Sequence, residues 1–371
     1  MCCVTIDAVF FGGVNEFFRI GLGGLLFVAG TAFAEDVLHI YNWNEYVGPT
    51  TVERSEKVCK RKVKYDTYGD SDELLARLDG GAKGYDILVP TGNAMATLIE
   101  KNAFKPIDKT PLRNRKNIKP EFLSTEFDKG NIYSVPYAYS LTVMGYDAEK
   151  MNEHGVPTDT WAAPFDPKYL TKIKGKFTVL DSPDELLAAA KKYKGYSPND
   201  TDPEHWDEAK QVISAAKPYW QAFNNTRYIR GLVTGSIWLA HGYDNDFFQA
   251  CLRAKEGKRE WRIAYTVPKE GDVSALDSPV IHKDAPRPDL THKFMNFMMA
   301  GEDLAKLLNM PGSGSPNAAA VPLLKPEIAS NRGIFPDAEI TKKLETPEDL
   351  TKDQRRLRSR LWTDIKMKTG G

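Results

Sequence analysis

The alternation of strand-forming and helix-forming stretches between residues 37 and 89 restricts the fold more than any other feature of the chain. Three β-rich stretches lie at residues 37–41, 62–66 and 85–89. Helices are expected between them, one beginning at Pro49 and one near Ser71, which can serve as an N-cap ahead of acidic residues. This β-α-β-α-β order predicts an α/β protein with a mostly parallel sheet flanked by helices.

A second block of alternating elements begins near Met144. Its expected strands are residues 177–180, 236–241 and 263–267, and its expected helices are residues 184–192 and 205–216. The chain has 371 residues, enough for two domains of ordinary size. Ligands of such sheets bind in the loops that follow the strands, which here include residues 42–46 and 90–93.

Residues 1–34 differ in kind from the rest of the chain. The stretch from Ile20 to Ala34 is almost entirely apolar, too short to span a bilayer, and ends in the small-x-small sequence Ala32-Phe33-Ala34. We therefore predict a cleaved signal peptide at 1–34 and a periplasmic mature protein. Its removal leaves 49 basic residues (50 − 1) and 48 acidic residues (50 − 2), so neither nucleic acid nor an anionic membrane is an expected partner.

The cysteines and histidines give no sign of a metal site. Cys2 and Cys3 leave with the leader, while Cys59 and Cys251 could pair in an oxidising compartment but are interpreted as free thiols. The six histidines are never three or four residues apart, and no Cys-x-x-Cys occurs. No metal and no other cofactor is expected.

An enzyme is the alternative of another class. The sequences Ser214-Ala-Ala-Lys217, Tyr243-Asp-Asn245 and Lys368-Thr-Gly370 follow the order found in serine acyl-enzymes. However, Pro218 ends the helix that such a serine should open, and Lys368 lies at the chain end. No catalytic residue is therefore assigned, and a hydrolase or transferase is disfavoured.

Aromatic residues lie beside carboxylates in several predicted loops and strand ends. The aromatic residues include Trp43, Tyr46, Tyr137, Tyr139 and Tyr243, and the acids are Glu45, Asp181, Asp184, Asp246 and Asp277. Aromatic faces and carboxylates together recognise organic cations. The alternative interpretation is core aromatics accompanied by solvated acids.

Short motifs in a fixed order identify a family resemblance. They are residues 38–46 (Leu-His-Ile-Tyr-Asn-Trp-Asn-Glu-Tyr), 85–91, 134–137, 145–147, 180–185, 267–271, 276–277 and 316–317. In this order and spacing the chain resembles, from about residue 38 to residue 362, the periplasmic spermidine/putrescine-binding proteins of ABC importers.

The resemblance implies a two-lobed periplasmic binding protein of the Venus flytrap kind, which closes on its ligand by hinge motion. One lobe would comprise residues 35–140 and 275–317, and the other residues 141–274 and 318–371. The implied partners are a polyamine-like cation and an inner-membrane ABC permease, with a chemoreceptor as the alternative, and the protein is expected to be a monomer. The implied ligand-binding residues are Trp43, Asn44, Glu45, Tyr46, Thr91, Asp181, Asp184, Tyr243, Asp246, Ala275, Asp277 and Ser313.

Three of these positions depart from the family pattern. Tyr243 replaces a common Trp, Ala275 stands where a Trp or Phe is usual, and Ser313 stands where a Tyr is usual. Smaller side chains enlarge the cleft, so a guanidinium compound, an amino-acid-like cation or a modified polyamine remains an alternative to putrescine or spermidine.

Overall fold

The computed structural model describes residues 37–43, 46, 49–68, 71–125, 127–348 and 350–367. The predicted leader lies outside these residues, as do Asn44 and Glu45. Residues from Val37 onward form one compact unit, so the predicted lobe boundaries remain a prediction.

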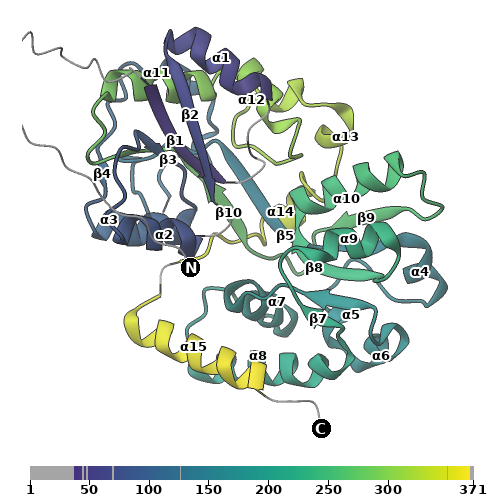
Figure 1. Cartoon of the computed structure of the whole chain (residues 1–371). Helices are drawn as coiled ribbons and strands as arrows, with labels where there is room; N and C mark the ends of the chain where they lie inside the picture. The colour runs from purple at the N-terminus through teal and green to yellow at the C-terminus, as the bar shows by residue number, and fades with distance from the viewer. Residues whose placement is uncertain are drawn as a thin grey trace, which may run out of the picture. The chain divides into compact units, whose positions relative to one another are not determined.

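The first sheet has the strand order β2-β1-β3-β11-β4 (Figure 1). Its strands are β1 (Val37–Trp43), β2 (Lys62–Tyr68), β3 (Ile87–Leu88), β4 (Phe104–Lys105) and β11 (Val280–His282). Strands β2, β1 and β3 run parallel, whereas β11 is antiparallel to β3 and β4. The fold therefore brings residues 280–282 between two strands formed nearly 200 residues earlier.

Strand β1 is buried on both faces, which explains its nearly continuous apolar sequence. Leu38 and Ile40 pack in one core cluster with residues of α1 (Pro49–Cys59) and α11 (Pro288–Met298). Tyr41 points to the other face and packs with residues of α2 (Ser71–Asp79) and α3 (Gly92–Glu100). Helix α12 (Gly301–Leu308) follows α11 and also contacts α1.

The second sheet has the order β10-β5-β8-β6-β7, with β9 also paired to β5. The strands are β5 (Ala138–Asp147), β6 (Phe177–Val179), β7 (Ala222–Phe223), β8 (Leu239–Tyr243), β9 (Ile263–Thr266) and β10 (Ser274–Asp277). Strand β5 is antiparallel to β8, β9 and β10, and β6 is parallel to β7 and β8. Asp277 ends β10 just before the chain enters β11, so it lies where the chain passes from one sheet to the other.

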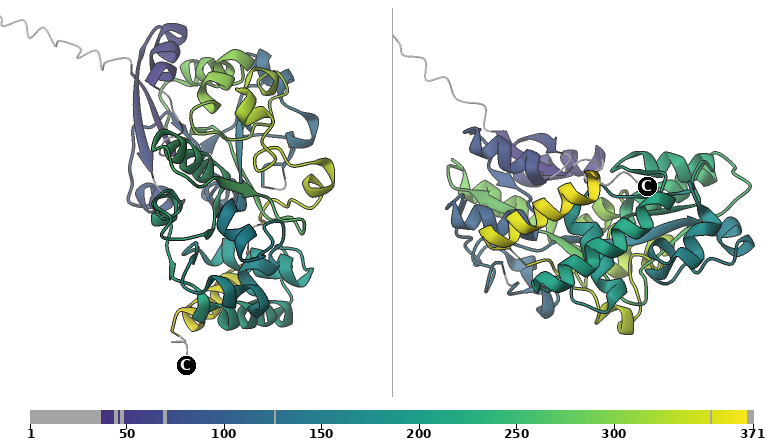
Figure 2. Two further views of the ribbon diagram at one scale, coloured as in Figure 1. Left: turned by 90° about the vertical axis from the view of Figure 1, so that its right-hand side faces the viewer. Right: turned by 90° about the horizontal axis from the view of Figure 1, so that it is seen from below.

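Helices of the second part of the chain surround this sheet. They are α7 (Pro183–Lys194), α8 (Pro203–Ala216), α9 (Arg227–Thr234), α10 (Asp244–Glu256) and α15 (Lys352–Met367), with the shorter α4 (Ala148–Glu153), α5 (Ala162–Phe165), α6 (Pro167–Leu170), α13 (Pro326–Ala329) and α14 (Ala338–Thr341). Helix α15, although last in sequence, lies beside α8 and contacts α7 (Figure 2). Its buried residues Leu361 and Ile365 join the core that α8 also lines.

The α/β class predicted from the sequence is confirmed, and both sheets are mixed. The expected parallel order holds for β2-β1-β3, while β5, β10 and β11 supply antiparallel pairs that the local sequence did not indicate. Cys59 and Cys251 are free thiols, as predicted. Within the described residues, no helix is long and apolar enough to cross a membrane, and no cluster of metal-ligating side chains occurs.

Candidate functional site

Asp277 is a buried carboxyl group at the end of β10. The residue is 1% exposed, and its Oδ2 accepts a hydrogen bond from the Tyr46 hydroxyl at 2.9 Å. Burial raises the pKa of Asp277 to about 7, although the nearby Tyr46 and Trp43 side chains act to lower it. Among the described residues, no Lys or Arg forms an ion pair with this carboxyl group, so no side-chain cation compensates its charge when it ionises.

The strand register places three of the predicted binding residues, Asp277, Ala275 and Tyr243, on one face of the second sheet. Asp277 lies opposite Ala138, and Ala275 lies opposite Ser140. Further along β5, Thr142 lies opposite Tyr243. Directly opposite residues, and alternate residues of one strand, share a face, so Asp277, Ala275 and Tyr243 all lie on the same side of β5.

Glu185 is a second acid on this face, partly exposed to solvent, and the sequence analysis did not single it out. It lies in the first turn of α7, where it accepts a hydrogen bond from the Thr142 hydroxyl. Tyr243 also bonds to this carboxyl group, and burial raises the pKa of Glu185 to about 7. In the sequence, only the acidic pair Asp184-Glu185 at the start of α7 indicated a binding residue here, and the prediction named Asp184 instead of Glu185.

Asp181 and Asp184 point away from this face. Asp181 pairs with Lys366 at 2.8 Å, and Asp184 pairs with Arg358, both on α15. Their side chains are 40% and 43% exposed. The structure therefore does not bring them together with Asp277, because the helical phase of α7 turns Glu185 inward instead.

Asp246 belongs to the first turn of α10, which begins after Tyr243. The Tyr228 hydroxyl donates a hydrogen bond to the Asp246 carboxylate. Asp246 and Glu185 both act to raise the pKa of the buried Tyr243 hydroxyl, after the larger effect of burial. Both acids therefore act on the hydroxyl group of Tyr243.

Asp244 is a fully buried acid that the sequence analysis also missed. Its Oδ1 accepts hydrogen bonds from the backbone N–H groups of Leu141 at 3.1 Å and Asn245 at 2.9 Å. Burial raises the pKa of Asp244 well above its usual range, and the Asp246 charge adds to this effect. No motif marked it, because its burial depends on β5 lying beside the end of β8.

The remaining predicted residues lie at several places. Ser313 is fully buried and lies beside the Tyr46 hydroxyl, whose pKa it acts to lower. Thr91 precedes α3, with its hydroxyl oxygen 3.3 Å from that of Ser71. Trp43 packs against the Tyr68 ring, with centroids 4.6 Å apart. Asn44 and Glu45 lie outside the described residues.

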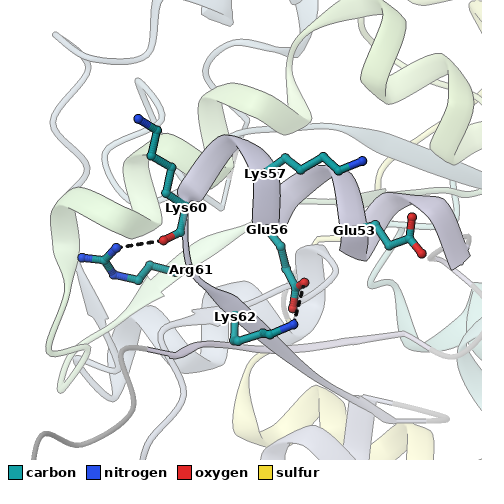
Figure 3. Close-up of a pocket in the computed structure, with 6 residues that line it drawn as sticks. All are labelled: Glu53, Glu56, Lys57, Lys60, Arg61 and Lys62. Carbon is teal, nitrogen blue, oxygen red and sulfur yellow. Dashed lines mark hydrogen bonds and ion pairs between the residues drawn. The ribbon is translucent and has the colours of Figure 1, made fainter.

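Two other polar regions do not belong to this site. A surface depression beside α1 is lined by Glu53, Glu56, Lys57, Lys60, Arg61 and Lys62 (Figure 3). It contains none of the predicted binding residues, and its side chains partly neutralise one another, as in the 3.3 Å pair between Lys62 and Glu56.

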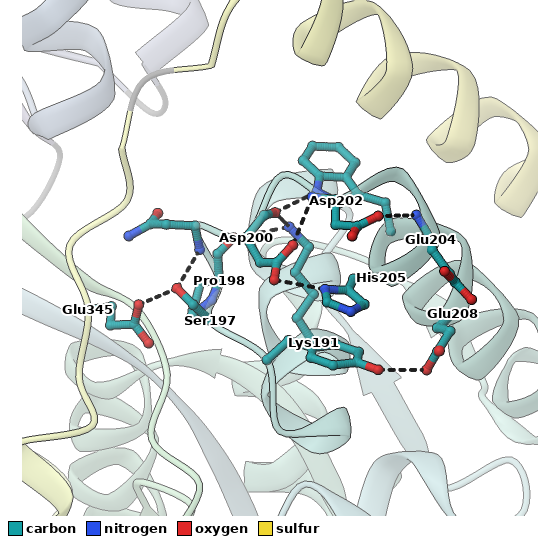
Figure 4. A network of polar contacts seen from close by, with 12 residues as sticks. Lys191, Ser197, Pro198, Asp200, Asp202, Glu204, His205, Glu208 and Glu345 are labelled. Carbon is teal, nitrogen blue, oxygen red and sulfur yellow. Dashed lines mark hydrogen bonds and ion pairs between the residues drawn. The ribbon is translucent and has the colours of Figure 1, made fainter.

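The buried Lys191 is the other polar region (Figure 4). Its ammonium group donates to the carbonyl oxygens of Pro198 at 3.1 Å and Asp200 at 2.6 Å, and it lies 4.1 Å from the centre of the Trp206 ring. Burial lowers the pKa of Lys191 to about 8. Its donors hold the loop after α7 in place, so it is not an anion-binding residue.

Comparison with known proteins gives a consistent result. The family model for bacterial extracellular solute-binding proteins matches residues 50–336. A putrescine/cadaverine-binding protein of Pseudomonas aeruginosa is 44% identical over 340 residues, which cover 92% of this chain and 96% of that protein. The putrescine-binding periplasmic protein PotF of Escherichia coli is 32% identical over 353 residues, covering 93% and 95%.

A solved structure has the same fold. The substrate-binding protein PotD of the spermidine/putrescine ABC transporter of Streptococcus pneumoniae superposes with a TM-score of 0.80. The match covers 89% of this chain and 98% of that one, at 24% sequence identity.

Proposed function

We propose, because the chain belongs to the family of bacterial extracellular solute-binding proteins, that it captures a small organic diamine or related polyamine and delivers it to an ABC permease. The family consists of binding proteins, which agrees with the absence of any assigned catalytic residue. The two-lobed periplasmic binding protein fold predicted from the resemblance is confirmed by the structural match.

The observation that carries this proposal is the set of buried acids without a protein cation. Asp277 and Asp244 are buried and Glu185 is partly buried, and none of the three forms an ion pair with a Lys or Arg of the described chain. Buried charges are normally paired, because an isolated buried carboxylate loses its hydration. A cationic ligand would supply the missing charge.

The arrangement suits a ligand with a charge at each end. Asp277, which accepts a hydrogen bond from Tyr46, forms one acidic pole, while Glu185 and Asp246, which both act on the Tyr243 hydroxyl, form another. The aromatic rings of Trp43 and Tyr243 lie near these two poles and offer faces to methylene groups or ammonium ions. The names of the relatives support a diamine, since they bind putrescine or cadaverine.

The predicted leader and the family relationship together support a periplasmic location. Residues 1–34 carry the signal-peptide pattern described above, and the relatives include periplasmic proteins. Transport through a permease is the family role, and the predicted monomer would present its bound ligand to that partner.

Isothermal titration calorimetry of the exported protein against putrescine and cadaverine tests the proposal. Asp277→Asn keeps the size of the side chain but removes its charge, and a hydrogen bond to a charged partner contributes about 1.5–3 kcal/mol. We expect diamine affinity to fall at least roughly tenfold in this variant.

Asp207→Asn, on the exposed surface of α8, is the matched control and should bind like the wild type. Spermidine, agmatine and arginine in the same series would reveal one of the alternative cations. Binding of neutral or anionic solutes without any diamine binding would reject the proposed ligand class.

A further inference from the structure

The first turn of α7, which carries Glu185, is held by two ion pairs with the C-terminal helix α15. Lys366 Nζ lies 2.8 and 2.9 Å from the two carboxylate oxygens of Asp181. Arg358 forms the other ion pair, with Asp184. Asp181 immediately precedes the N-cap of α7, and Asp184 immediately precedes Glu185. The two ion pairs therefore attach the turn that carries Glu185 to α15 on both sides of the helix start.

Helix α15 is itself held firmly in place. Its residues Leu361 and Ile365 are 5% and 0% exposed and belong to the core that α8 also lines. Lys217, which follows α8, donates from Nζ to the carbonyl oxygens of Ile365 at 2.7 Å and Lys366 at 2.9 Å. These carbonyl groups belong to the last turn, where a helix supplies no partner of its own. Arg358 and Lys366 are thus presented from a fixed element, about two turns apart.

The start of α7 needs such support. The first N–H groups of a helix have no partner within the helix. Ser182 Oγ accepts from the N–H of Glu185, but at 3.4 Å this capping bond is long. The Glu185 carboxylate accepts a hydrogen bond from the Thr142 hydroxyl of β5. The position of that carboxylate therefore depends on how the first turn of α7 is held against β5.

We propose that Arg358 and Lys366 are positioning residues for ligand binding. By holding Asp184 and Asp181, they keep the Glu185 carboxylate in place before an ammonium group of the ligand arrives. Order that exists before binding does not have to be created by the ligand, so affinity rises. This inference rests on the proposed function, because it concerns the acid that receives one end of the diamine.

Electrostatics alone would give an effect of the opposite sign. Arg358 carries a positive charge, which repels a cationic ligand, so its removal without any structural role would raise diamine affinity. Loss of positioning lowers the affinity instead. The direction of the change in Arg358→Gln therefore separates the two effects.

Calorimetric titration of the exported protein with putrescine tests the proposal. We expect Arg358→Gln and Lys366→Gln each to weaken binding about 2- to 5-fold, the range that partly exposed ion pairs contribute. Arg358→Lys keeps the charge that faces Asp184 and should remain within about 1.5-fold of the wild type. The matched control is Arg360→Gln, which removes the same charge from an exposed position of α15 and should not weaken binding.

A double-mutant cycle shows whether Arg358 acts through Glu185. In a Glu185→Gln background, adding Arg358→Gln should change putrescine affinity by less than about 1.5-fold, since the carboxylate to be positioned is gone. A change in stability alone would not produce this coupling.

An equal loss with and without Glu185, or an unchanged or raised affinity in Arg358→Gln, would overturn the positioning role while leaving the proposed function intact. Absence of diamine binding by the wild type would overturn the proposed function itself. Thermal melting of each variant accompanies the titrations, and if Arg358→Gln does not fold, Lys366→Gln in the same cycle decides the result.

Discussion

Asp277 and Glu185 show how two acids of ordinary sequence context acquire unusual protonation behaviour. Burial raises the pKa of each to about 7, whereas exposed carboxyl groups titrate near 4. Hydroxyl donors from Tyr46 and Thr142 lower these values but do not replace a counter-charge. The protonation state of both groups is therefore coupled to whether a cation is present.

Diamine affinity should depend on pH. Since both acids hold protons up to about pH 7 in the free native protein, the cation must displace them below that pH. We expect affinity to rise at least roughly tenfold per pH unit between pH 5.5 and 7 and then to level off. Calorimetry at several pH values, in buffers of different ionisation enthalpy, should detect proton release near pH 6.5.

The same raised pKa values make the free energy of unfolding fall with rising pH, whereas diamine affinity rises. Between about pH 4 and 7 the native free protein binds protons that the unfolded chain has lost, so its free energy of unfolding falls as pH rises. Asp277→Asn should flatten both the stability and the affinity profiles. Affinity that does not vary with pH in the wild type would contradict this account.

Sequence analysis found some site residues and missed others for identifiable reasons. Trp43, Tyr46 and Asp277 were found because they stand in motifs at strand ends, and the structure brings them together. Asp184 was predicted instead of Glu185. Which of these two adjacent acids faces inward depends on the residue at which helix α7 begins, and the sequence did not fix that residue closely enough. Asp244 was missed because its burial is created by a distant strand.

Among the secondary-structure elements, the connection at residues 343–348 lies beside strand β10 and joins it to helix α7. Glu345 exchanges backbone hydrogen bonds with Asp272 and Ser274, at 3.0 and 2.9 Å. Its carboxylate accepts from Lys192 of α7 and from Ser197 (Figure 4). This connection therefore ties the strand that carries Asp277 to helix α7, which carries Glu185.

Where residue 271 packs against Lys343, the fold should require glycine. Gly271 has a φ of +79°, and an added Cβ would lie 2.3 Å from the Lys343 carbonyl oxygen. Gly271→Ala should lower the free energy of unfolding by about 2–4 kcal/mol, since it adds a backbone clash to an unfavourable φ. Urea unfolding curves measure the change.

Gly81→Ala is the matched control, because Gly81 also has a φ of +79° but no atom within 4 Å of its added Cβ. Its expected cost is about 1 kcal/mol, from the positive φ alone. Equal costs at the two positions would show that the contact with Lys343 contributes nothing.

Most of the alternating strands and helices were predicted from local sequence, whereas β5 and α15 were not. The stretches forming β1, β2, α1 and α7 were assigned correctly, because each carries its own periodicity or cap. The ten-residue strand β5 was not recognised, because its antiparallel partners are remote in sequence. Helix α15 was also missed, and with it the cations that hold Asp181 and Asp184 outward.

For the whole molecule, ligand binding should appear as thermal stabilisation. A ligand that binds only the native state at 100 times its Kd adds about 2.7 kcal/mol to the free energy of unfolding. For a protein of this size we expect the Tm to rise by roughly 3–6 °C with putrescine or cadaverine. Differential scanning fluorimetry measures the shift, with an anionic diacid of equal length as the control; a similar rise with the diacid would contradict cation selectivity.

The pairing of β10 with residues near Glu345 also has a consequence for the time course of biogenesis. Strand β10 is flanked by β5, formed about 135 residues before it, and by the connection about 70 residues after it. In a chain that crosses a membrane N-terminus first, the pairing of residues 272–274 with Glu345 can form only after residue 345 has emerged. A chain truncated before residue 345 would therefore lack the contacts that tie β10 to helix α7.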